Sequence, residues 1–496
     1  MEGPMFRRLT PIRVLTFALA ALTLLALCTP VEAGPPRARL SRDLADHLSS
    51  GGTAPVRVIV RGSRETVAAL AARHGATPKR WLGTAGVLEV TPEQLQALAD
   101  DPEVISLSGD VPVHPTMAVT NQAIGTELLQ MVGAAEKGLT GRGVGIAVVD
   151  SGIAPVPSIR ERVVASVDFT GGAGEDAFGH GTHVAGIIAA AADDTLPVVT
   201  ERYQGVAPGA HLVNLRVLDG EGAGRVSDVI RAVEWAVANR RRYGIRVINL
   251  SLGHPVFESA ADDPLCEAVE RAVAAGMVVV AAAGNLGKTA DGTPVIGGIE
   301  SPGNSPYAIT VGALNTKQTG VRSDDVVATY SSRGPTAYDF TLKPDLVAPG
   351  NRIVSLEAPG SMLAVNYGGQ HVAGSGDRSY FQLSGTSMST AVVSGAVALL
   401  LEANPRLEPL KVKGALQLGA SFLPEAGLIG AGAGSLNVAA SVQVATQGPN
   451  ALEPVLIAGE EVTPDGVMFW RADSDADASR IIWGDRIIWG DRIIWG

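Results

Sequence analysis

Hydrophobic and polar positions divide the chain into segments with different rhythms. After an apolar N-terminal run, strand-like and helix-like patterns alternate in two blocks, residues 34–118 and 119–445, and the rhythm stops after about residue 445. The first block predicts strands at residues 56–60, 84–90 and 104–107, and helices at residues 65–74 and 92–99. Thr91 and Gln94 give the second helix a capping box. We therefore predict a small α+β domain, with its helices packed on one sheet face.

The second block has the strand–helix alternation of a parallel sheet covered on both faces. Helices are predicted where apolar residues share one helical face between residues 226 and 237, and over residues 264–275. The predicted strands are residues 145–149, 212–218, 247–252, 277–283 and 308–311. The fold class is thus α/β, with a doubly wound, mostly parallel sheet. Such sheets place their chemistry at the carboxyl ends of the strands.

The first 33 residues have the pattern of a secretory signal peptide. Arg7, Arg8 and Arg13 precede an apolar run over residues 14–27, and Ala33 offers a small residue before a cut. A membrane helix needs about 20 apolar residues, so this run is too short to span. We therefore predict a secreted, extracytoplasmic protein with no membrane span in the mature chain. Because Cys28 lies in the signal, Cys266 remains alone and no internal disulfide is expected.

Composition narrows the function classes. With 46% hydrophobic and 18% charged residues the chain is globular, and its formal charge of −11 leaves no basic face for phosphates. Nucleic acid is therefore not expected as a partner.

Three polar side chains stand at the ends of predicted elements in the second block. Asp150 follows the strand at residues 145–149, His180 opens a helix of small residues to about residue 192, and Ser387 opens a long, nearly uncharged helix. Singly, they have plain interpretations as a turn aspartate, a polar helix start and an N-cap serine. Together they supply a nucleophile, the base that takes its proton and the carboxylate that orients the base. The set predicts a serine hydrolase.

A metal site is not predicted around the histidines. His180 and His183 lack the glutamate of the His-Glu-x-x-His arrangement that zinc hydrolysis uses. We expect His183 to be a packed neighbour instead.

The motifs at residues 147–152, 180–186 and 385–388 resemble those of the subtilisin-like serine peptidases, the subtilase family, with the same Asp, His, Ser order. The resemblance covers a catalytic domain at residues 119–445. It implies a monomeric endopeptidase that cleaves proteins or peptides through an acyl-enzyme and is made as an inactive precursor. It also implies that residues 34–118 are a propeptide, acting as intramolecular inhibitor and folding chaperone and removed near residues 116–122.

The resemblance implies further site residues. Asn285 is the expected oxyanion-hole residue. Glu300 falls near the floor of the pocket for the residue preceding the cut, where a carboxylate would favour Lys or Arg; an exposed loop carboxylate is the simpler interpretation. The residues expected to bind the substrate are Ser251, Leu252, Gly253, Gly284 and Glu300.

Some features depart from the family pattern. Residues 389–392 lack its proline, so we expect altered helix geometry rather than lost activity. The glycine-rich stretch at residues 368–376 is predicted to be a surface insertion. The chemistry requires no cofactor. Asp193 and Asp194 could bind structural calcium, but the family's calcium loop is not recognisable, and an exposed helix end is the simpler explanation.

The C-terminal extension, residues 446–496, ends in a hexapeptide repeat. The sequence Arg-Ile-Ile-Trp-Gly-Asp begins at Arg480 and recurs from Arg486 and Arg492. An even period keeps each repeat position on one face of a strand, which allows stacked strands or edge addition; a low-complexity flexible tail is the alternative. An alternative for the whole chain is a catalytically silent surface or adhesive protein that displays these repeats, although an intact triad argues against it.

Overall fold

The computed structural model describes residues 38–40, 42–81, 85–109, 116–126, 129, 138–172, 175–191, 203–374, 378–470, 480–483 and 486–489. The chain forms two compact units, Met1–Val113 and His114–Gly496. The predicted signal peptide lies outside the described residues, as do Asp193, Asp194 and the third repeat.

The first unit contains a five-stranded sheet with the order β1-β5-β2-β4-β3. Its elements are β1 (Arg39–Leu40), α2 (Arg42–Ser49), β2 (Val56–Arg61), α3 (Arg64–His74), β3 (Thr77–Trp81), β4 (Ala85–Val90), α4 (Pro92–Ala99) and β5 (Ser106–Gly109). The predicted capping box of α4 is present. The predicted unit of three strands and two helices was incomplete, because β1, α2 and β3 were missed. Strand β3 contains Pro78 and has a bulge beside it at the sheet edge, where a proline is tolerated.

The second unit is built on an eight-stranded sheet, and its parallel core confirms the predicted fold class. The strand order is β12-β11-β10-β9-β6-β8-β7, with β13 also paired to β11, and of these pairs only β11–β12 is antiparallel. The strands are β6 (Gly145–Asp150), β7 (Val163–Asp168), β8 (His211–Arg216), β9 (Ile245–Leu250), β10 (Val278–Ala282), β11 (Ile309–Asn315), β12 (Val326–Val327) and β13 (Leu346–Pro349).

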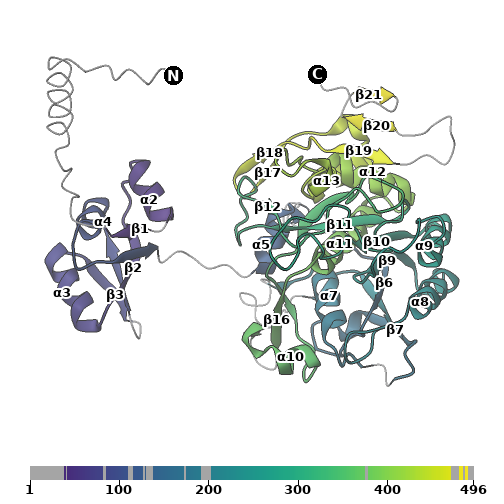
Figure 1. Ribbon diagram of the computed structural model, residues 1–496, viewed down its shortest axis with the longest axis horizontal. Coiled ribbons are helices and arrows are strands. Elements are labelled where there is room, and N and C mark those ends of the chain that lie inside the picture. Colours follow the sequence, from purple (N-terminus) through teal and green to yellow (C-terminus); the bar gives the residue numbers. More distant parts are fainter. Residues whose placement is uncertain are drawn as a thin grey trace, which may run out of the picture. The chain divides into compact units, whose positions relative to one another are not determined.

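Helices cover both faces of this sheet (Figure 1). One face carries α8 (Val226–Asn239) and α9 (Pro264–Ala274); the other carries α7 (His180–Ala189), α11 (Thr386–Ala403), α12 (Pro409–Gly419) and α14 (Val438–Gln447). Alternate residues of a strand point to opposite faces. Accordingly, Ile146 and Val148 pack with α7 and α11, whereas Ala147 and Val149 pack with α8 and α9.

Helix α11 is the central helix of the second unit. Among the described helices it is the one long and apolar enough to cross a membrane, but 83% of it is buried inside the fold, as for a core helix. It runs unbroken through residues 389–392, where the family's proline is missing.

The predicted surface insertion lies beside α7. Strands β14 (Ile353–Leu356), β16 (Ser379–Leu383) and β15 (His371–Ala373) form a small antiparallel sheet that carries α10 (Met362–Asn366) and the 3-10 turn Gly368–Gln370. The described residues of the glycine-rich stretch are exposed or half-buried, as predicted.

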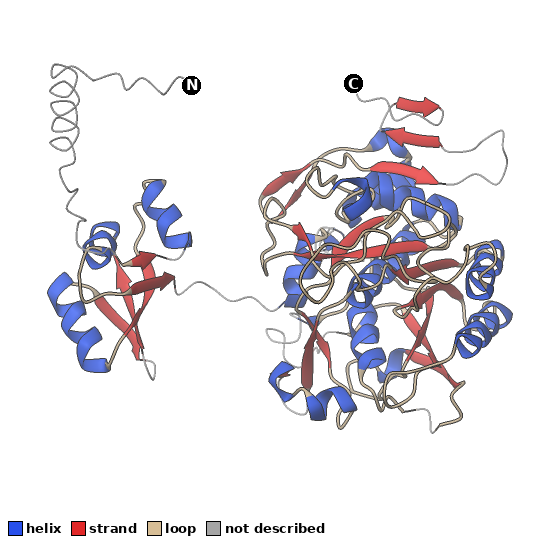
Figure 2. Cartoon of the chain, viewed as in Figure 1, coloured by secondary structure: helices blue, strands red, loops and turns tan. Residues whose placement is uncertain are grey.

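The prediction that regular structure stops near residue 445 was wrong. Beyond α14 lie β17 (Val455–Ile457), β18 (Glu460–Val462), β19 (Val467–Trp470), β20 (Arg480–Trp483) and β21 (Arg486–Trp489). Figure 2 shows these short strands gathered at one end of the second unit. Strands of three or four residues are too short to show a hydrophobic period, so the sequence pattern missed β17, β18 and β19. Strands in the repeats were one of the two predicted alternatives, and β20 and β21 are such strands.

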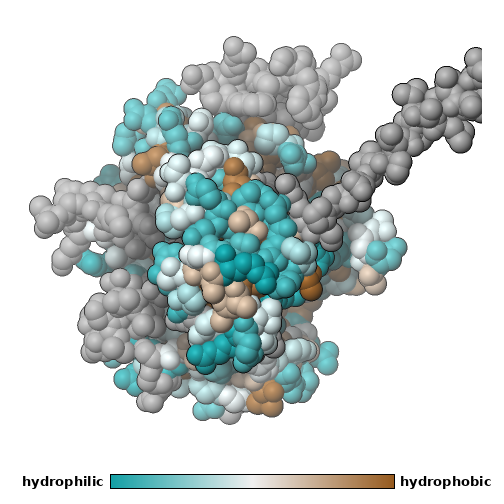
Figure 3. Space-filling view, turned by 90° about the vertical axis from the view of Figure 1, so that its left-hand side faces the viewer, coloured by the Kyte–Doolittle hydropathy of each residue, from teal (hydrophilic) through white to brown (hydrophobic). Residues whose placement is uncertain are grey.

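Some large apolar side chains are exposed. Examples are Phe257 and Phe340, which lie in different loops. The face drawn in Figure 3 is mainly hydrophilic, with hydrophobic residues in small separate groups. Among the described residues drawn there, no single large apolar patch is visible.

Candidate active site

Asp150 and Ser251 lie side by side at the carboxyl edge of the sheet. Strands β6 and β9 are parallel neighbours in which Val149 is opposite Leu250. Asp150 follows Val149, and Ser251 follows Leu250. Neighbouring strands of a sheet are about 4.8 Å apart. The sheet therefore brings the predicted carboxylate next to the segment at residues 251–253.

His180 contacts Asp150 directly. Its Nδ1 lies 2.7 Å from Asp150 Oδ1, which also accepts a 2.8 Å hydrogen bond from the Ser151 N–H. The Asp150 side chain is 1% exposed and that of His180 is 16% exposed. A carboxylate only accepts, so Nδ1 carries the proton and Nε2 is the nitrogen left for a second partner.

The surroundings of His180 raise its pKa. Burial by itself lowers this pKa, but the charge of Asp150, its hydrogen bond and the charge of Asp176 outweigh burial and raise the pKa above the ordinary histidine value. Two carboxylates thus stabilise the imidazolium that forms when His180 accepts a proton.

Asp176 is a site residue that the sequence analysis missed. This buried carboxylate accepts hydrogen bonds from Ser151 Oγ at 2.8 Å, Gly179 N at 2.7 Å, and Thr182 N and Oγ1 at 2.8 and 2.5 Å. Burial raises its pKa, and these donors oppose that shift. The network joins the loop after β6 to the first turn of α7, and so it holds Asp150 and His180 in register. An aspartate shortly before a glycine N-cap was the available signal, because Gly179 has no side chain to cap α7.

His183 is the packed neighbour that was predicted. It is fully buried, and its Nε2 lies 2.9 Å from the Phe381 carbonyl oxygen. Burial and the charge of His180 lower its pKa to about 3, so it is neutral at working pH.

Ser387 lies in the first turn of α11 and is joined to the end of β9. Its hydroxyl donates to the Ser251 carbonyl oxygen at 2.9 Å, and the Ser251 hydroxyl donates to the Ser387 carbonyl oxygen at 2.9 Å. Since Ser251 neighbours Asp150, these bonds place the serine at the same sheet edge as the Asp150–His180 pair. The single hydroxyl proton is directed at Ser251 in this structure.

Asn285 follows β10 and is held by the residue before Ser387. Asn285 Oδ1 accepts hydrogen bonds from Thr386 N at 3.0 Å and Thr386 Oγ1 at 3.2 Å, which leaves the amide Nδ2 free to donate elsewhere. The Ser387 N–H lies in the first turn of α11, where backbone donors have no intrahelical partner. Two donors thus lie near the positive end of one helix. The role of Thr386 in holding Asn285 was not predicted.

Glu300 is half-buried, so its interpretation as an exposed loop carboxylate was wrong. The Glu300 side chain lies against both Gly253 and Gly284. A side chain at position 284 would collide with the Glu300 carboxylate. Burial raises its pKa, whereas a hydrogen bond from the Asn285 N–H and the charge of His254 lower it. An isolated antiparallel β-bridge between His254 and Ser301 holds the segment around Glu300 beside residues 251–253. The sequence of a loop does not reveal such a contact.

The described residues contain no group of three or more His, Cys, Asp or Glu side chains arranged to hold a metal ion.

A parallel sheet with an aspartate–histidine pair and a helix-borne serine at its carboxyl edge defines the class of α/β serine hydrolases. Residues 141–446 match the model of the subtilase family. The chain is 39% identical over 311 residues to "Serine protease AprX" of Bacillus subtilis (strain 168), covering 61% of this chain and 67% of that protein. It is 34% identical over 345 residues to an alkaline protease of Alkalihalobacillus alcalophilus (70% and 76% covered) and 35% identical over 308 residues to subtilisin Savinase of Lederbergia lenta (62% and 94% covered).

The chain therefore belongs to the subtilase family, as its motifs indicated. It is a serine endopeptidase, a hydrolase whose substrates are proteins or peptides. The alternative of a silent adhesive protein is not favoured.

Proposed function

We propose that the chain cleaves peptide bonds with Asp150 as orienting carboxylate, His180 as general base and Ser387 as nucleophile. The observation that carries the proposal is the 2.7 Å bond between Asp150 and His180 beside the strand end to which Ser387 is joined. The test is the replacement of Ser387 with Ala, which should nearly abolish peptide hydrolysis.

The reaction begins when the Ser387 hydroxyl turns from Ser251 toward His180 Nε2, a side-chain rotation on the ps–ns scale. His180 takes the hydroxyl proton while Oγ bonds to the substrate carbonyl carbon, whose oxygen becomes an anion. Asn285 Nδ2 and the Ser387 N–H stabilise that anion. The C–N bond then breaks, His180 gives its proton to the leaving amine, and water hydrolyses the acyl-enzyme by the same steps. No step uses a cofactor.

The raised pKa of His180 predicts the acid limb of the pH profile. The base works only when neutral, so activity falls as pH drops through the pKa of His180. We expect the half-maximal point of the acid limb of kcat/KM to lie above the ordinary histidine value of about 6.5. A series of rates with a peptide that has an uncharged residue before the cut measures this point. An acid limb near pH 5 would contradict the assignment of Asp150 and Asp176 as charged neighbours of His180.

We propose that residues 251–253 hold the substrate as an extended strand, with Glu300 at the base of the pocket for the residue before the cut. Strand ends with free backbone groups accept an added strand. The Glu300 carboxylate lies against Gly253 and Gly284, two glycines whose missing side chains leave room there. A half-buried carboxylate in that place attracts a Lys or Arg side chain.

Replacing Glu300 with Gln is expected to lower kcat/KM for peptides with Lys before the cut by about tenfold or more, because a charge pair is lost. Peptides with Leu at that position should change by less than about twofold. The parent preference for Lys should also weaken as pH falls through the raised pKa of Glu300, since protonation removes the charge. Glu221→Gln, on an exposed loop, is the matched control. A parent enzyme that prefers Phe or Leu over Lys refutes the assignment.

The first unit serves, in this proposal, as the propeptide of a secreted precursor. In support, it has its own buried core, including Val58, Leu70, Leu88 and Leu95. The expected removal region, residues 116–122, falls in α5 (Thr116–Ala123). Proteases act on extended chains, so this helix has to open before the propeptide is removed. The N-terminal pattern of residues 1–33 supports export of the precursor.

A further inference from the structure

The first two hexapeptide repeats pair with each other as β-strands. Strands β20 and β21 are antiparallel, and the register sets Arg480 opposite Trp489, Ile481 opposite Ile488, Ile482 opposite Ile487 and Trp483 opposite Arg486. The first residue of the motif therefore faces the fourth, and the second faces the third. This register is symmetric, so each repeat is complementary to a copy of itself.

The repeat sheet starts from a strand that is fixed on the catalytic domain. Strand β19 pairs with β20, setting Val467 opposite Trp483. Phe469 of β19 is buried against Ala420, and its N–H donates to Gln417 Oε1 of α12 at 3.3 Å. The first two repeats thus extend the sheet from an anchored strand.

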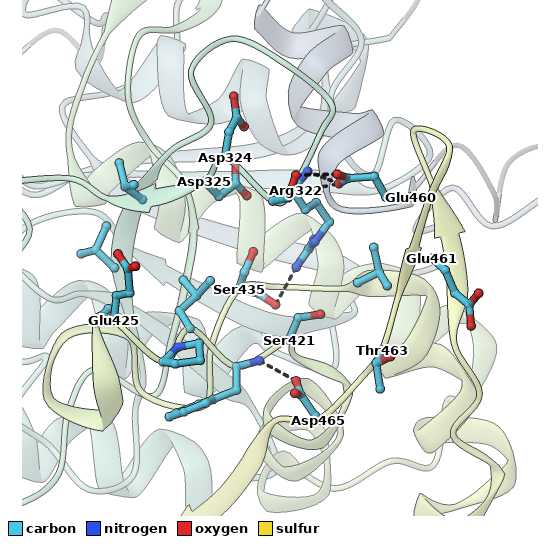
Figure 4. Close-up of a pocket in the computed structure, with 18 of the residues that line it drawn as sticks. Arg322, Asp324, Asp325, Ser421, Glu425, Ser435, Glu460, Glu461, Thr463 and Asp465 are labelled. Carbon is cyan, nitrogen blue, oxygen red and sulfur yellow. Dashed lines mark hydrogen bonds between the residues drawn. The ribbon is translucent and has the colours of Figure 1, made fainter. Parts of the chain in front are cut away.

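The segment before β19 is anchored as well, at a pocket of about 860 Å³ (Figure 4). There Glu460 of β18 accepts hydrogen bonds from the N–H of Arg322 at 2.5 Å and from Ser323 Oγ at 2.6 Å. Asp465 accepts from the Phe422 N–H at 2.7 Å. Contacts on both sides of residues 460–470 hold β19 in place, so the repeats start from a defined position.

Within the described part of the chain, β21 pairs with β20 alone. The far edge of such a strand has backbone N–H and C=O groups that can pair with another strand. The third repeat, from Arg492, has the same four residues, so if it adds to β21 it presents the same edge again. The outermost edge therefore has the same four residues whichever repeat is outermost.

We propose that this edge binds the repeats of a second copy of the chain, antiparallel and in the register that β20 and β21 use. A symmetric register is what a twofold interface between identical chains requires. Each complete repeat contains one Arg and one Asp, so two repeats can approach without net repulsion although the chain carries a charge of −11. This inference replaces the expectation of a monomer, and it stands apart from the catalytic proposal.

The test is sedimentation velocity of the full chain from about 1 to 100 µM, in a Ser387→Ala background that prevents self-digestion. We expect concentration-dependent dimers and larger species. Ile487→Pro removes a backbone donor inside β21 and should weaken association about 100-fold. Ile487→Val, which keeps strand propensity, should associate as the parent does. Circular dichroism and thermal unfolding check that each variant is folded.

Two outcomes would overturn the proposal. If the parent chain stays monomeric up to 100 µM, the edge does not bind a second copy and instead pairs within one chain or with another partner. An Ile487→Pro variant that associates as strongly as the parent puts the interface elsewhere. Peptidase activity, measured separately without the Ser387 substitution, reports on the catalytic proposal alone.

Discussion

Replacing Ser387 with Ala is expected to lower kcat for peptide hydrolysis by about 10⁶-fold, with little change in KM. The substitution removes the atom that forms the acyl-enzyme but leaves the substrate-binding surface intact. His180→Ala should cost about as much, and Asp150→Asn about 10⁴-fold, because the wrong imidazole tautomer is then favoured. Since the three groups act as one unit, the double variant Ser387→Ala/His180→Ala should be no slower than either single variant by more than a few-fold.

The measurements are the hydrolysis of casein and of a chromogenic peptide, with mass spectrometry of the purified chain. Ser227→Ala is the matched control, because Ser227 is an exposed serine of α8 and should keep parental activity. In Ser387→Ala the precursor should stay uncut between residues 116 and 122. Undiminished digestion by Ser387→Ala means that the nucleophile is wrong. If Ser387→Ala no longer digests the substrates but its precursor is still cut normally, only the proposal that the enzyme matures itself is refuted.

Replacing Asn285 with Ala is expected to lower kcat by about 10² to 10³-fold, with KM nearly unchanged. The amide donor acts on charge that exists only in the transition state, so its loss raises the barrier without weakening ground-state binding. The donor is already oriented, because Thr386 holds the other end of the same amide.

Steady-state kinetics with one peptide measures this effect on kcat and KM separately. Asn366→Ala, on the exposed helix α10, is the matched control and should match the parent. Should Asn285→Ala raise KM alone, Asn285 is a substrate-binding residue rather than an oxyanion donor. If kcat falls by less than about threefold, groups other than Asn285 stabilise the oxyanion.

Local sequence was informative where an element is long or has its own capping signal. The apolar run before Asp150 predicted β6 to within one residue, and Thr91 with Gln94 predicted the start of α4. The small-residue helix after His180 was also predicted, although it ends at Ala189 rather than near residue 192. Each of these signals depends on neighbours a few residues away, which the chain order displays directly.

Elements and contacts that depend on distant residues were missed. Strand β3 contains Pro78 and polar residues and becomes a strand because β4 pairs with it. Asp176 owes its place to the donors of Ser151 and Thr182, and Glu300 owes its burial to Gly253 and Gly284. Long-range contacts of this kind produce no hydrophobic period in the sequence, so these residues were predicted to lie in loops.

By itself, the amino-acid sequence determined the fold class, the family and the identity of the candidate catalytic residues, because their motifs and the hydrophobic period are local. Only the tertiary structure decided how those residues meet. Strand pairing of β6 with β9 sets Asp150 beside Ser251, and the Asp176 network holds His180 to Asp150. The repeats show the same division: their period is visible in the chain, but whether a repeat faces its copy depends on backbone hydrogen bonds between strands.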